Sequence, residues 1–294
     1  MNPKTEEAIK ILRQGGIVIF PTDTAIGIGC RIDKIESVKR VFDIKKRDYN
    51  KPLMALVDTM EMAEEYVSIP NDVHEKLLDQ YWPGGLTVFL KCDLGKVPSI
   101  VRSGTDTLAL RLPAHKDIRD VIKRVGVPIL ATSANFSGDP TPYSISEVNK
   151  ELLSKVDFVL DGECTFKKES TIIDCTIEPW KIIRQGAVKL KITLLLDTAD
   201  NKKITVGLNI NGREYIDTEK ITSNKTQIIL PMIDAILKKH KVEMKDILEI
   251  KVNTGLGSFT GLRVGLAIAN ALSFVLRIPV NGKKVGEVIL PTYS

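Results

Sequence analysis

The feature that most limits the fold is a strand-like apolar run that ends abruptly in polar residues. The run Val127–Ala131 predicts a buried strand, and Thr132–Gly138 follows it directly. Hydroxyls, an amide and a glycine at such a strand end are typical of ligand sites at the edge of an α/β sheet. The stretch has no His, Cys or carboxylate, so it can position an anion or a polar ligand but supplies no metal ligand and no activated nucleophile. A plain Ser/Asn/Gly turn that leaves a strand is the alternative.

Other strand ends in the first 190 residues repeat this pattern. The run Ile17–Phe20 ends in Pro21–Thr24, Glu169–Asp174 carries two hydroxyls, and a later strand ends in Arg184. These strand ends bring hydroxyls, amides and cations together without a catalytic cluster of His, Cys or carboxylates. The pattern favours an enzyme that orients anionic reactants and lets a substrate act as the nucleophile.

Two sets of cations are candidates for binding an anion. Four of the seven residues from Lys45 to Lys51 are cations, and a compact ammonium beside a planar guanidinium suits a polyphosphate. A solvated charged surface is the alternative. Arg111 lies in the apolar strand-like run Thr107–Pro113, where it requires either an internal carboxylate or an anionic ligand, and the sequence leaves both open.

Composition sets the broad class of protein. A length of 294 residues suggests two domains, and the net charge of +5 mildly favours anionic partners such as nucleotides or RNA. The four cysteines are far apart in the sequence and predict neither a zinc site nor a disulfide framework. The first residues do not look like a signal peptide, and no apolar run reaches the roughly 18 residues of a membrane span. We therefore expect a cytoplasmic protein with no membrane contact.

The pattern restarts near Lys189 without a flexible linker. Two strands up to Ile210, an Asn211–Gly212 turn and a third strand predict a hairpin meander, followed by a helix, a strand and a second helix. The glycine-rich loop Gly255–Gly261 lacks the Gly-Lys-Ser/Thr of a phosphate-binding loop, so tight helix packing is its expected role. Small residues on the helix after it allow another helix to approach, either inside this lobe or from a partner.

Residues 1–190 resemble the YrdC-like threonylcarbamoyl-AMP synthase family along their whole length. The resemblance implies an α/β fold with a strongly twisted mixed sheet around a basic concave cavity. It also implies conversion of L-threonine, bicarbonate and ATP to threonylcarbamoyl-AMP and pyrophosphate, for a modified adenosine in tRNA. The motifs that carry it are Pro21–Thr24, Lys45-x-Arg47, Lys51–Leu53, Trp82-Pro83-Gly84-x-Leu86-Thr87, Arg111–Pro113, Thr132-Ser133-Ala134-Asn135-x-Ser137-Gly138 and Ser170-Thr171.

Matching these motifs residue by residue assigns roles. The carbamate of threonine would attack the α-phosphorus of ATP, while the protein supplies charge and position and Mg²⁺ helps the pyrophosphate to leave; the metal ligands stay open. The residues expected to act in catalysis are Lys45, Arg47, Ser133 and Asn135. Those expected to bind substrate are Thr22, Thr24, Lys51, Arg111, Thr132, Ser170, Thr171 and Arg184.

Four positions depart from the family pattern. Ile26 replaces an aromatic residue, Gly85 replaces a common proline, and Glu163 and Lys168 stand where glycine is more usual. These departures bear on the affinity for substrate more than on the class of reaction.

Residues 191–294 resemble the N-terminal lobe of the TsaB family, through Asp197-Thr198, Leu230–Ile233 and Gly257–Arg263. The resemblance implies a small actin-like ATPase (RNase H-like) α/β lobe that acts as a scaffold for a transferase of the TsaD type. Because one lobe cannot close an ATP cleft, we expect no second catalytic site here.

Two other functions stay open on the sequence. One is a non-catalytic module that binds nucleotide or RNA through the same basic cavity. The other keeps the carbamoyl-adenylate chemistry but changes the acceptor, as in related domains of hydrogenase-maturation proteins. The absence of cysteine pairs like those of zinc fingers argues against the second.

Overall fold

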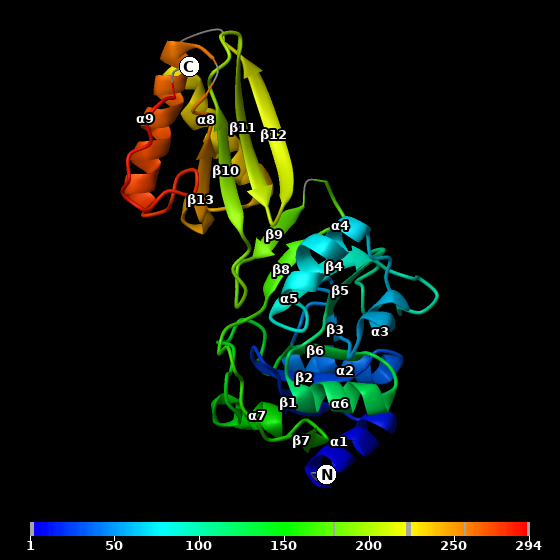
Figure 1. Ribbon diagram of the computed structural model, residues 1–294. Coiled ribbons are helices and arrows are strands. Elements are labelled where there is room, and N and C mark those ends of the chain that lie inside the picture. Colours follow the sequence, from blue (N-terminus) through cyan, green and yellow to red (C-terminus); the bar gives the residue numbers. More distant parts are fainter. Residues whose placement is uncertain (1–2, 179, 222–224, 256, 293–294) are drawn as a thin grey trace. The chain divides into compact units, whose positions relative to one another are not determined.

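The structure is a computed structural model that describes residues 3–178, 180–221, 225–255 and 257–292. The chain divides into two compact units, Met1–Lys189 (unit 1) and Leu190–Ser294 (unit 2). Figure 1 colours unit 1 from blue to green and unit 2 from yellow-green to red. Leu256 of the predicted glycine loop lies outside the described residues.

Unit 1 is a mixed α/β fold, as the sequence predicted. Its strands are β1 (Val18–Pro21), β2 (Ile26–Arg31), β3 (Met54–Leu56), β4 (Leu86–Lys91), β5 (Thr107–Arg111), β6 (Ile129–Ser133), β7 (Phe158–Val159), β8 (Thr171–Asp174) and β9 (Lys181–Arg184). Its helices are α1 (Pro3–Arg13), α2 (Ile35–Lys45), α3 (Met60–Glu64), α4 (Asn71–Val73), a π-helical turn (His74–Leu78), α5 (Asp79–Tyr81), α6 (Lys116–Val125), a 3₁₀ turn (Ile145–Glu147) and α7 (Lys150–Leu153).

The described strands of unit 1 form one mixed sheet in the order β7-β1-β2-β6-β3-β5-β4-β8-β9. Strand β6, which ends in the polar stretch that begins at Thr132, lies between β2 and β3 and is antiparallel to both. Strand β5, which ends at Arg111, is parallel to β3 and antiparallel to β4. Strands β6 and β5 thus lie on either side of β3 near the middle of the sheet and run in opposite directions.

Helices α1 and α6 cover part of one face of this sheet. Apolar residues at helical spacing on both helices join a cluster with Phe20 of β1 and Ile129 of β6. The helices lie side by side, α1 in blue and α6 in green (Figure 1). Complete burial of a side chain such as Phe20 contributes roughly 2–3 kcal/mol to the free energy of unfolding. The rest of this face is left for the cavity described below.

A close approach of β2 to β6 requires glycine at position 29. Gly29 pairs with Ala131, and a Cβ added to Gly29 would lie 1.9 Å from the carbonyl oxygen of Leu130. The same register places Gly27 opposite Ser133. The pairing of these two strands therefore determines where the polar end of β6 lies.

One stretch of unit 1 differs from its local sequence pattern. Ser144-Ile145-Ser146-Glu147 has the pattern of a capping box, which predicts a helix to about Leu153, but the structure has a 3₁₀ turn and then the separate helix α7. Glu147 accepts hydrogen bonds from Ser144 Oγ and from the backbone N–H of Tyr143, and Asn149 caps α7. Because the Glu147 carboxylate bonds outside the expected box, it stabilises a turn rather than one continuous helix.

The elements described in unit 2 are β10 (Ile192–Asp197), β11 (Lys203–Ile210), β12 (Arg213–Lys220), α8 (Lys225–His240), a 3₁₀ turn (Met244–Asp246), β13 (Glu249–Val252) and α9 (Phe259–Leu276). The described strands form one sheet in the order β12-β11-β10-β13, with β13 parallel to β10. Asn211 and Gly212 both have positive φ and connect β11 to β12, so the predicted hairpin turn is confirmed.

The small residues of α9 serve an internal contact on one side of the helix. Gly261 and Gly265 are buried against Thr198, whose hydroxyl donates to the carbonyl of Gly261 (2.8 Å). On the other side Phe274 is 81% exposed and Val275 is 75% exposed. Among the described residues, α9 is the one helix long and apolar enough to cross a membrane; core helices of soluble proteins meet the same criterion.

Substitution Gly29→Ala tests the close contact between β2 and β6. The added methyl group meets backbone, so we expect a loss of roughly 1–3 kcal/mol in the free energy of unfolding. Urea denaturation followed by tryptophan fluorescence measures it, because both tryptophans, Trp82 and Trp180, lie in unit 1. Gly95→Ala, at an exposed glycine, should change stability by less than about 0.5 kcal/mol. Equal midpoints for the two variants would contradict the register.

Candidate functional site

A buried ion pair anchors the polar turn after β1. Arg111, at the end of β5, pairs through Nη2 with Oδ1 of Asp23, and both side chains are about 2% exposed. Its Nη1 donates to Thr24 Oγ1, and its Nε donates to the carbonyl of Gly84 (2.9 Å). Burial lowers the pKa of Arg111, and the charge of Asp23 opposes that shift. Of the two partners left open for Arg111, the structure supplies the internal carboxylate.

The turn held by this ion pair presents hydroxyls. Thr22 Oγ1 accepts hydrogen bonds from the backbone N–H groups of Thr24 (3.2 Å) and Ala25 (3.1 Å), and it lies 3.1 Å from Thr24 Oγ1. The backbone N–H of Ile26 donates to the carbonyl of Pro142. This turn is therefore fixed on both sides before any ligand binds.

A cavity of about 370 Å³ lies over the uncovered part of the sheet. Ala109 and Arg111 of β5 line it, as do Ala131 and Ser133 of β6; residues two apart on a strand point to one face of a sheet. Its floor is apolar and its edge carries hydroxyls, arginines and a carboxylate. The lining residues are Thr22, Thr24, Ala25, Ile26, Gly27, Arg47, Pro52, Leu53, Met54, Thr87, Phe89, Ala109, Arg111, Ala131, Thr132, Ser133, Thr141, Glu169, Ser170, Ile172, Ile183 and Arg184.

Eight of the twelve residues predicted from the motifs line this cavity. They are Thr22, Thr24, Arg47, Arg111, Thr132, Ser133, Ser170 and Arg184. The other four, Lys45, Lys51, Asn135 and Thr171, do not line it.

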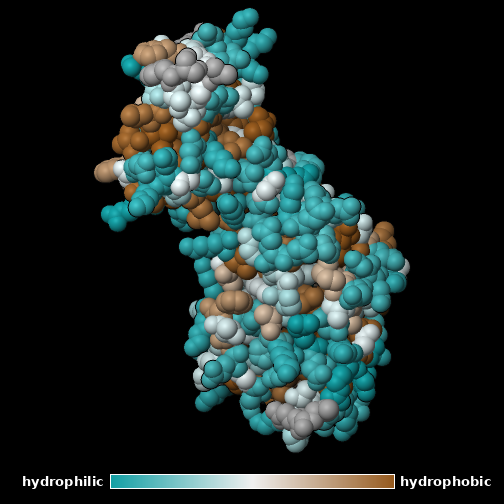
Figure 2. All heavy atoms as spheres, viewed as in Figure 1, coloured by the Kyte–Doolittle hydropathy of each residue, from teal (hydrophilic) through white to brown (hydrophobic). Residues whose placement is uncertain are grey.

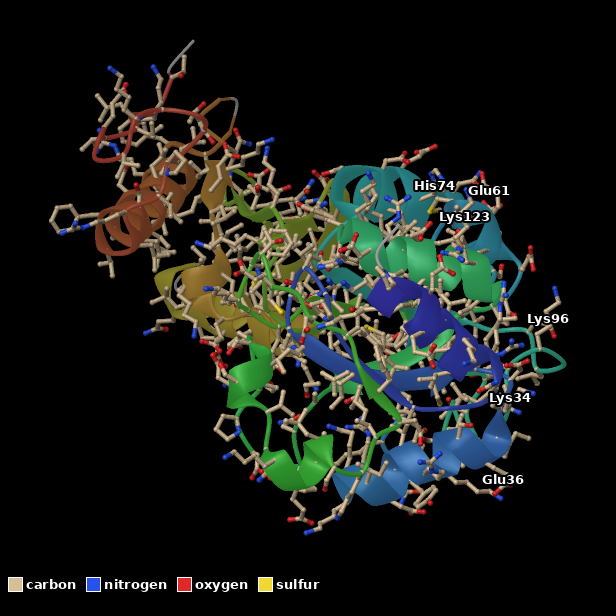
Figure 3. All side chains as sticks on the ribbon, turned by 90° about the horizontal axis from the view of Figure 1, so that it is seen from below. Lys34, Glu36, Glu61, His74, Lys96 and Lys123 are labelled. Atoms are coloured by element: carbon tan, nitrogen blue, oxygen red, sulfur yellow. The ribbon has the colours of Figure 1, made fainter. Side chains whose placement is uncertain are left out.

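Lys45 is the main departure from the expected arrangement. It ends α2 and is 2% exposed, whereas charged side chains of unit 1 such as Lys34 and Lys96 point outward (Figure 3). Its Nζ donates to the carbonyl of Ser133, to the carbonyl of Asn135 (2.5 Å) and to Asn135 Oδ1 (3.2 Å). Lys45 thus donates hydrogen bonds to the turn after β6 and does not line the cavity.

The charge state of Lys45 is sensitive to its surroundings. Burial lowers the pKa of Lys45 to about 7; the charge of Arg47 adds to this shift, and Asp139 opposes it. The three oxygen acceptors around Nζ favour the protonated ammonium. The protonated lysine can donate to all three oxygens, whereas the neutral amine has only two N–H donors.

Asn135 acts within the same turn. Ser133 Oγ donates to Asn135 Oδ1 (2.6 Å), and Asn135 Nδ2 donates to the carbonyl of Asp139 (2.6 Å).

Thr171, which is fully buried, accepts hydrogen bonds from the backbone N–H groups of Gly186 (2.8 Å) and Val188 (3.2 Å). The side chains of Asn135 and Thr171 therefore hold backbone segments next to residues that line the cavity.

The cations that follow α2 do not all face the cavity. Arg47 lines the cavity, and its guanidinium is oriented by the carbonyls of Lys51 (3.1 Å) and Pro52 (2.9 Å). Burial lowers the pKa of Arg47. Lys51 is exposed and does not line the cavity, and its carbonyl accepts a hydrogen bond from Arg47; its contact with substrate stays a prediction.

Another part of the cavity lining is built around Ser170. Its Oγ accepts hydrogen bonds from Thr87 Oγ1 (2.9 Å) and from Nη2 of Arg184 (3.3 Å), while its carbonyl accepts one from Arg184 Nε (3.0 Å). Nη1 of Arg184 pairs with Glu169 (2.9 Å), and Thr141 Oγ1 donates to the same carboxylate (3.1 Å). This part of the lining therefore presents an arginine in a defined orientation.

Sequence reasoning did not assign Thr87, Thr141 or Glu169 to the site. Thr87 ends the Trp82–Thr87 motif and Glu169 directly precedes Ser170, so adjacency to matched motifs could have indicated both. No comparable signal was used for Thr141, which reaches the cavity through the loop after β6.

The departures from the family pattern affect the cavity unequally. Ile26 lines it although the residue is fully buried. A Cβ at Gly85 would lie 2.9 Å from the Cβ of Ala187, so glycine allows close packing there. Glu163 and Lys168 are exposed and do not line the cavity. Ile26 is thus the departure in contact with the cavity.

The donors available to a metal are few. Among the described residues, no group of three or more His, Cys, Asp or Glu side chains could hold a metal ion. The described residues that line the cavity include one carboxylate, Glu169, and several hydroxyls. This set fits Mg²⁺ that arrives on phosphates and keeps several waters, because such Mg²⁺ takes one or two carboxylates from a protein.

Two family models match the chain. One, for Sua5, YciO and YrdC proteins and described as telomere recombination, matches residues 10–186. The other, described as tRNA N6-adenosine threonylcarbamoyltransferase, matches residues 218–284. The second match does not support the expected TsaB-like lobe, because the matched family is TsaD, the transferase itself. The RNase H-like fold of unit 2 stays a prediction.

Two curated relatives are similar to the chain in sequence. A putative threonylcarbamoyl-AMP synthase of Methanocaldococcus jannaschii is 38% identical over 183 residues, which cover 62% of this chain and 85% of the relative. A threonylcarbamoyl-AMP synthase of Pyrococcus abyssi is 32% identical over 239 residues, which cover 80% of this chain and 67% of the relative.

Two solved structures share the fold. A double variant of P. abyssi Sua5 superposes with a TM-score of 0.59 at 36% identity, over 62% of this chain and 56% of that one. P. abyssi Sua5 complexed with L-threonine has a TM-score of 0.59 at 23% identity, over 95% and 89% of the two chains. The twisted mixed sheet expected for residues 1–190 is therefore confirmed.

The pH dependence of stability tests the burial of Lys45. The unfolded chain keeps this proton up to the ordinary pKa of 10.5, whereas the folded chain releases it near 7, so between these values the unfolded state binds more protons. The free energy of unfolding of the wild type should therefore rise with pH relative to Lys45→Met, by at most about 1.4 kcal/mol per pH unit. The cost of burying the ammonium is fully present below pH 7 and declines as the pH rises.

Urea denaturation of both proteins across this pH range measures the difference, and titrations shared by the two cancel. Parallel curves would show that the oxygens of Ser133 and Asn135 hold the ammonium in its charged form throughout.

Proposed function

Because the chain belongs to the Sua5–YciO–YrdC family, as its motifs predicted, we propose that it is an L-threonylcarbamoyladenylate synthase. It forms threonylcarbamoyl-AMP and pyrophosphate from L-threonine, bicarbonate and ATP, for threonylcarbamoyladenosine modification of tRNA. The relatives named as threonylcarbamoyl-AMP synthases support the activity. Pyrococcus Sua5, whose structure has been solved as a complex with L-threonine, supports that substrate.

The observation that carries the proposal is the chemistry of the cavity lining. Among the described residues, those that line the cavity include no His, Cys or Lys; they offer hydroxyls, the arginines Arg47, Arg111 and Arg184, and a single carboxylate. Such a site has no nucleophile of its own activated by a base, so the nucleophile comes from a substrate. A carbamate that attacks a bound nucleotide meets this requirement.

The reaction balances without a protein nucleophile. The amine of threonine adds to bicarbonate with loss of water and gives a carbamate. A carbamate oxygen then bonds to the α-phosphorus of ATP, while the bond from that phosphorus to the bridging oxygen breaks and pyrophosphate leaves with the electron pair. This makes the enzyme a nucleotidyltransferase, in which positioning and charge stabilisation supply the catalysis.

The residues fall into two groups by contact. Arg47 and Arg184, which both line the cavity, bind the phosphates, and Ser133 and Thr132 meet the α-phosphate and carbamoyl region. Thr22 and Thr24 bind threonine, next to the buried Arg111. Lys45, Asn135 and Thr171 are positioning residues, because they hold backbone that carries the first group.

Mg²⁺ is proposed to enter with ATP. When bound it would neutralise charge on the phosphates. Glu169 is the cavity carboxylate that would hold it.

For unit 2 we propose a role in binding a partner protein of the transferase type, with no second catalytic site. The exposed apolar residues of α9 support such a surface. Figure 2 shows hydrophobic residues in brown gathered on the part of unit 2 that carries α9. We also propose that the protein contacts tRNA and is located in the cytoplasm.

Pyrophosphate release from ATP by the full chain tests the function. Release should require both L-threonine and bicarbonate. Release that ignores threonine would contradict the proposal. Salt-sensitive binding of tRNA without any release would instead favour the non-catalytic RNA-binding module.

A pair of variants tests which cation of the 45–51 cluster contacts phosphate. Arg47→Ala should lower kcat/KM for ATP by at least about 100-fold, because Arg47 faces the cavity and stabilises charge in the transition state. Lys51→Ala, the matched control, should stay within about twofold of the wild type, because its side chain is exposed and only its carbonyl is used. Equal losses in the two variants would mean that the cluster acts as a general positive surface.

A further inference from the structure

Glu169 is the one carboxylate among the described residues that line the cavity. Its Oε1 pairs with Nη1 of Arg184 (2.9 Å) and accepts a hydrogen bond from Thr141 Oγ1 (3.1 Å). An acidic side chain in a site for a polyphosphate repels the ligand unless it has a second function. The placement of Glu169 therefore needs a reason beyond the sequence next to it.

The backbone at Glu169 is fixed while its carboxylate is accessible. The carbonyl of Glu169 accepts a hydrogen bond from Ala187 N (2.7 Å), and a Cβ at Gly186 would lie 2.3 Å from that carbonyl oxygen. The side chain, by contrast, is 38% exposed. The carboxylate can thus change partner without movement of the strand that follows it.

Arg184 keeps its orientation when Glu169 leaves. Its Nε donates to the carbonyl of Ser170 (3.0 Å) and its Nη2 to Ser170 Oγ (3.3 Å), so Nη1 is the part of the guanidinium that Glu169 occupies. An arginine fixed in this way presents that nitrogen to a phosphate oxygen as soon as the carboxylate turns away.

The pair is weak enough to exchange. Both side chains are more than a third exposed, and ion pairs in such surroundings contribute about 0–1 kcal/mol. The Arg111–Asp23 pair of the same cavity wall is about 2% exposed and has no such freedom. The cavity thus combines one permanent ion pair with one that a ligand can open.

We propose that Glu169 is an exchangeable counter-ion that makes the site select metal-bound ATP over free ATP. In the empty site it neutralises Arg184. When MgATP binds, a phosphate takes its place on Arg184, and the carboxylate turns to Mg²⁺ or to its water shell. Free ATP supplies the phosphate but leaves the displaced carboxylate beside it uncompensated. This inference rests on the proposed function, because it takes MgATP as the ligand.

Equilibrium binding of ATP to the full chain tests this, with Mg²⁺ and with a chelator, and without threonine or bicarbonate so that no turnover occurs. The wild type should bind MgATP more tightly than free ATP. In Glu169→Gln, free ATP should bind more tightly than to the wild type and MgATP more weakly. Together these changes should reduce the ratio of the two dissociation constants by about tenfold, or about 1.4 kcal/mol.

Two further variants make the result specific. Glu169→Asp keeps the charge and should retain part of the preference for MgATP. Glu151→Gln removes an exposed carboxylate of α7 that pairs with Lys155 and does not line the cavity, so it should leave both dissociation constants unchanged. Thermal unfolding of each variant confirms that it is folded.

The outcomes separate the two proposals. Equal changes for MgATP and free ATP in Glu169→Gln would overturn the counter-ion role and leave Glu169 as a structural partner of Arg184. Suppose that Glu169→Gln loses the preference for MgATP, while the wild-type chain releases no pyrophosphate in response to threonine. This result would support the counter-ion role of Glu169 and overturn the synthase activity. Absence of ATP binding by the wild type would overturn both.

Discussion

The cavity depends above all on the buried ion pair between Arg111 and Asp23. One guanidinium connects the end of β5, the turn after β1 and the carbonyl of Gly84, segments that are far apart in the sequence. Removal of either partner would leave an uncompensated buried charge, at a cost of about 3–5 kcal/mol. Because this pair orients Thr24 and the turn around it, the wall of the cavity is formed before substrate arrives.

A preformed wall suits a reaction in which the substrates supply the reactive groups. Neutral hydroxyls from Thr22, Thr24 and Ser133 orient polar ligands without competing as acids or bases, and Arg47 supplies fixed positive charge. The apolar floor excludes water from one side of the ligands, which strengthens electrostatic interactions in the cavity. Lys45 contributes from outside the cavity, by bonding the carbonyls that set the path of the turn after β6.

Much of this arrangement could be predicted from local patterns. Apolar runs with polar ends indicated the strands that carry Ser133 and Arg111, and Asn211–Gly212 indicated a hairpin because both residues tolerate positive φ. The direction of a long side chain was not predictable in this way. Whether Lys45 faces the cavity or the carbonyls of the turn after β6 depends on how α2 packs against β2, which is a contact that a local pattern does not show. Glu169 was missed although it directly precedes the matched Ser170, because adjacency to a motif does not show whether a side chain faces the cavity. The residues after Lys189 were predicted to form an α/β unit, as they do. They were also expected to resemble the TsaB family, but the family model that matches them is that of the TsaD transferase.

The most direct test of the account is the identity of the product. The full chain would be incubated with ATP, L-threonine and isotopically labelled bicarbonate, and the adenylate formed would be analysed by mass spectrometry. The account predicts an adenylate that contains threonine and carries the label in its carbamoyl carbon, with pyrophosphate as the second product. Unlabelled AMP, or ADP with phosphate, would contradict the claim that the carbamate of threonine is the nucleophile.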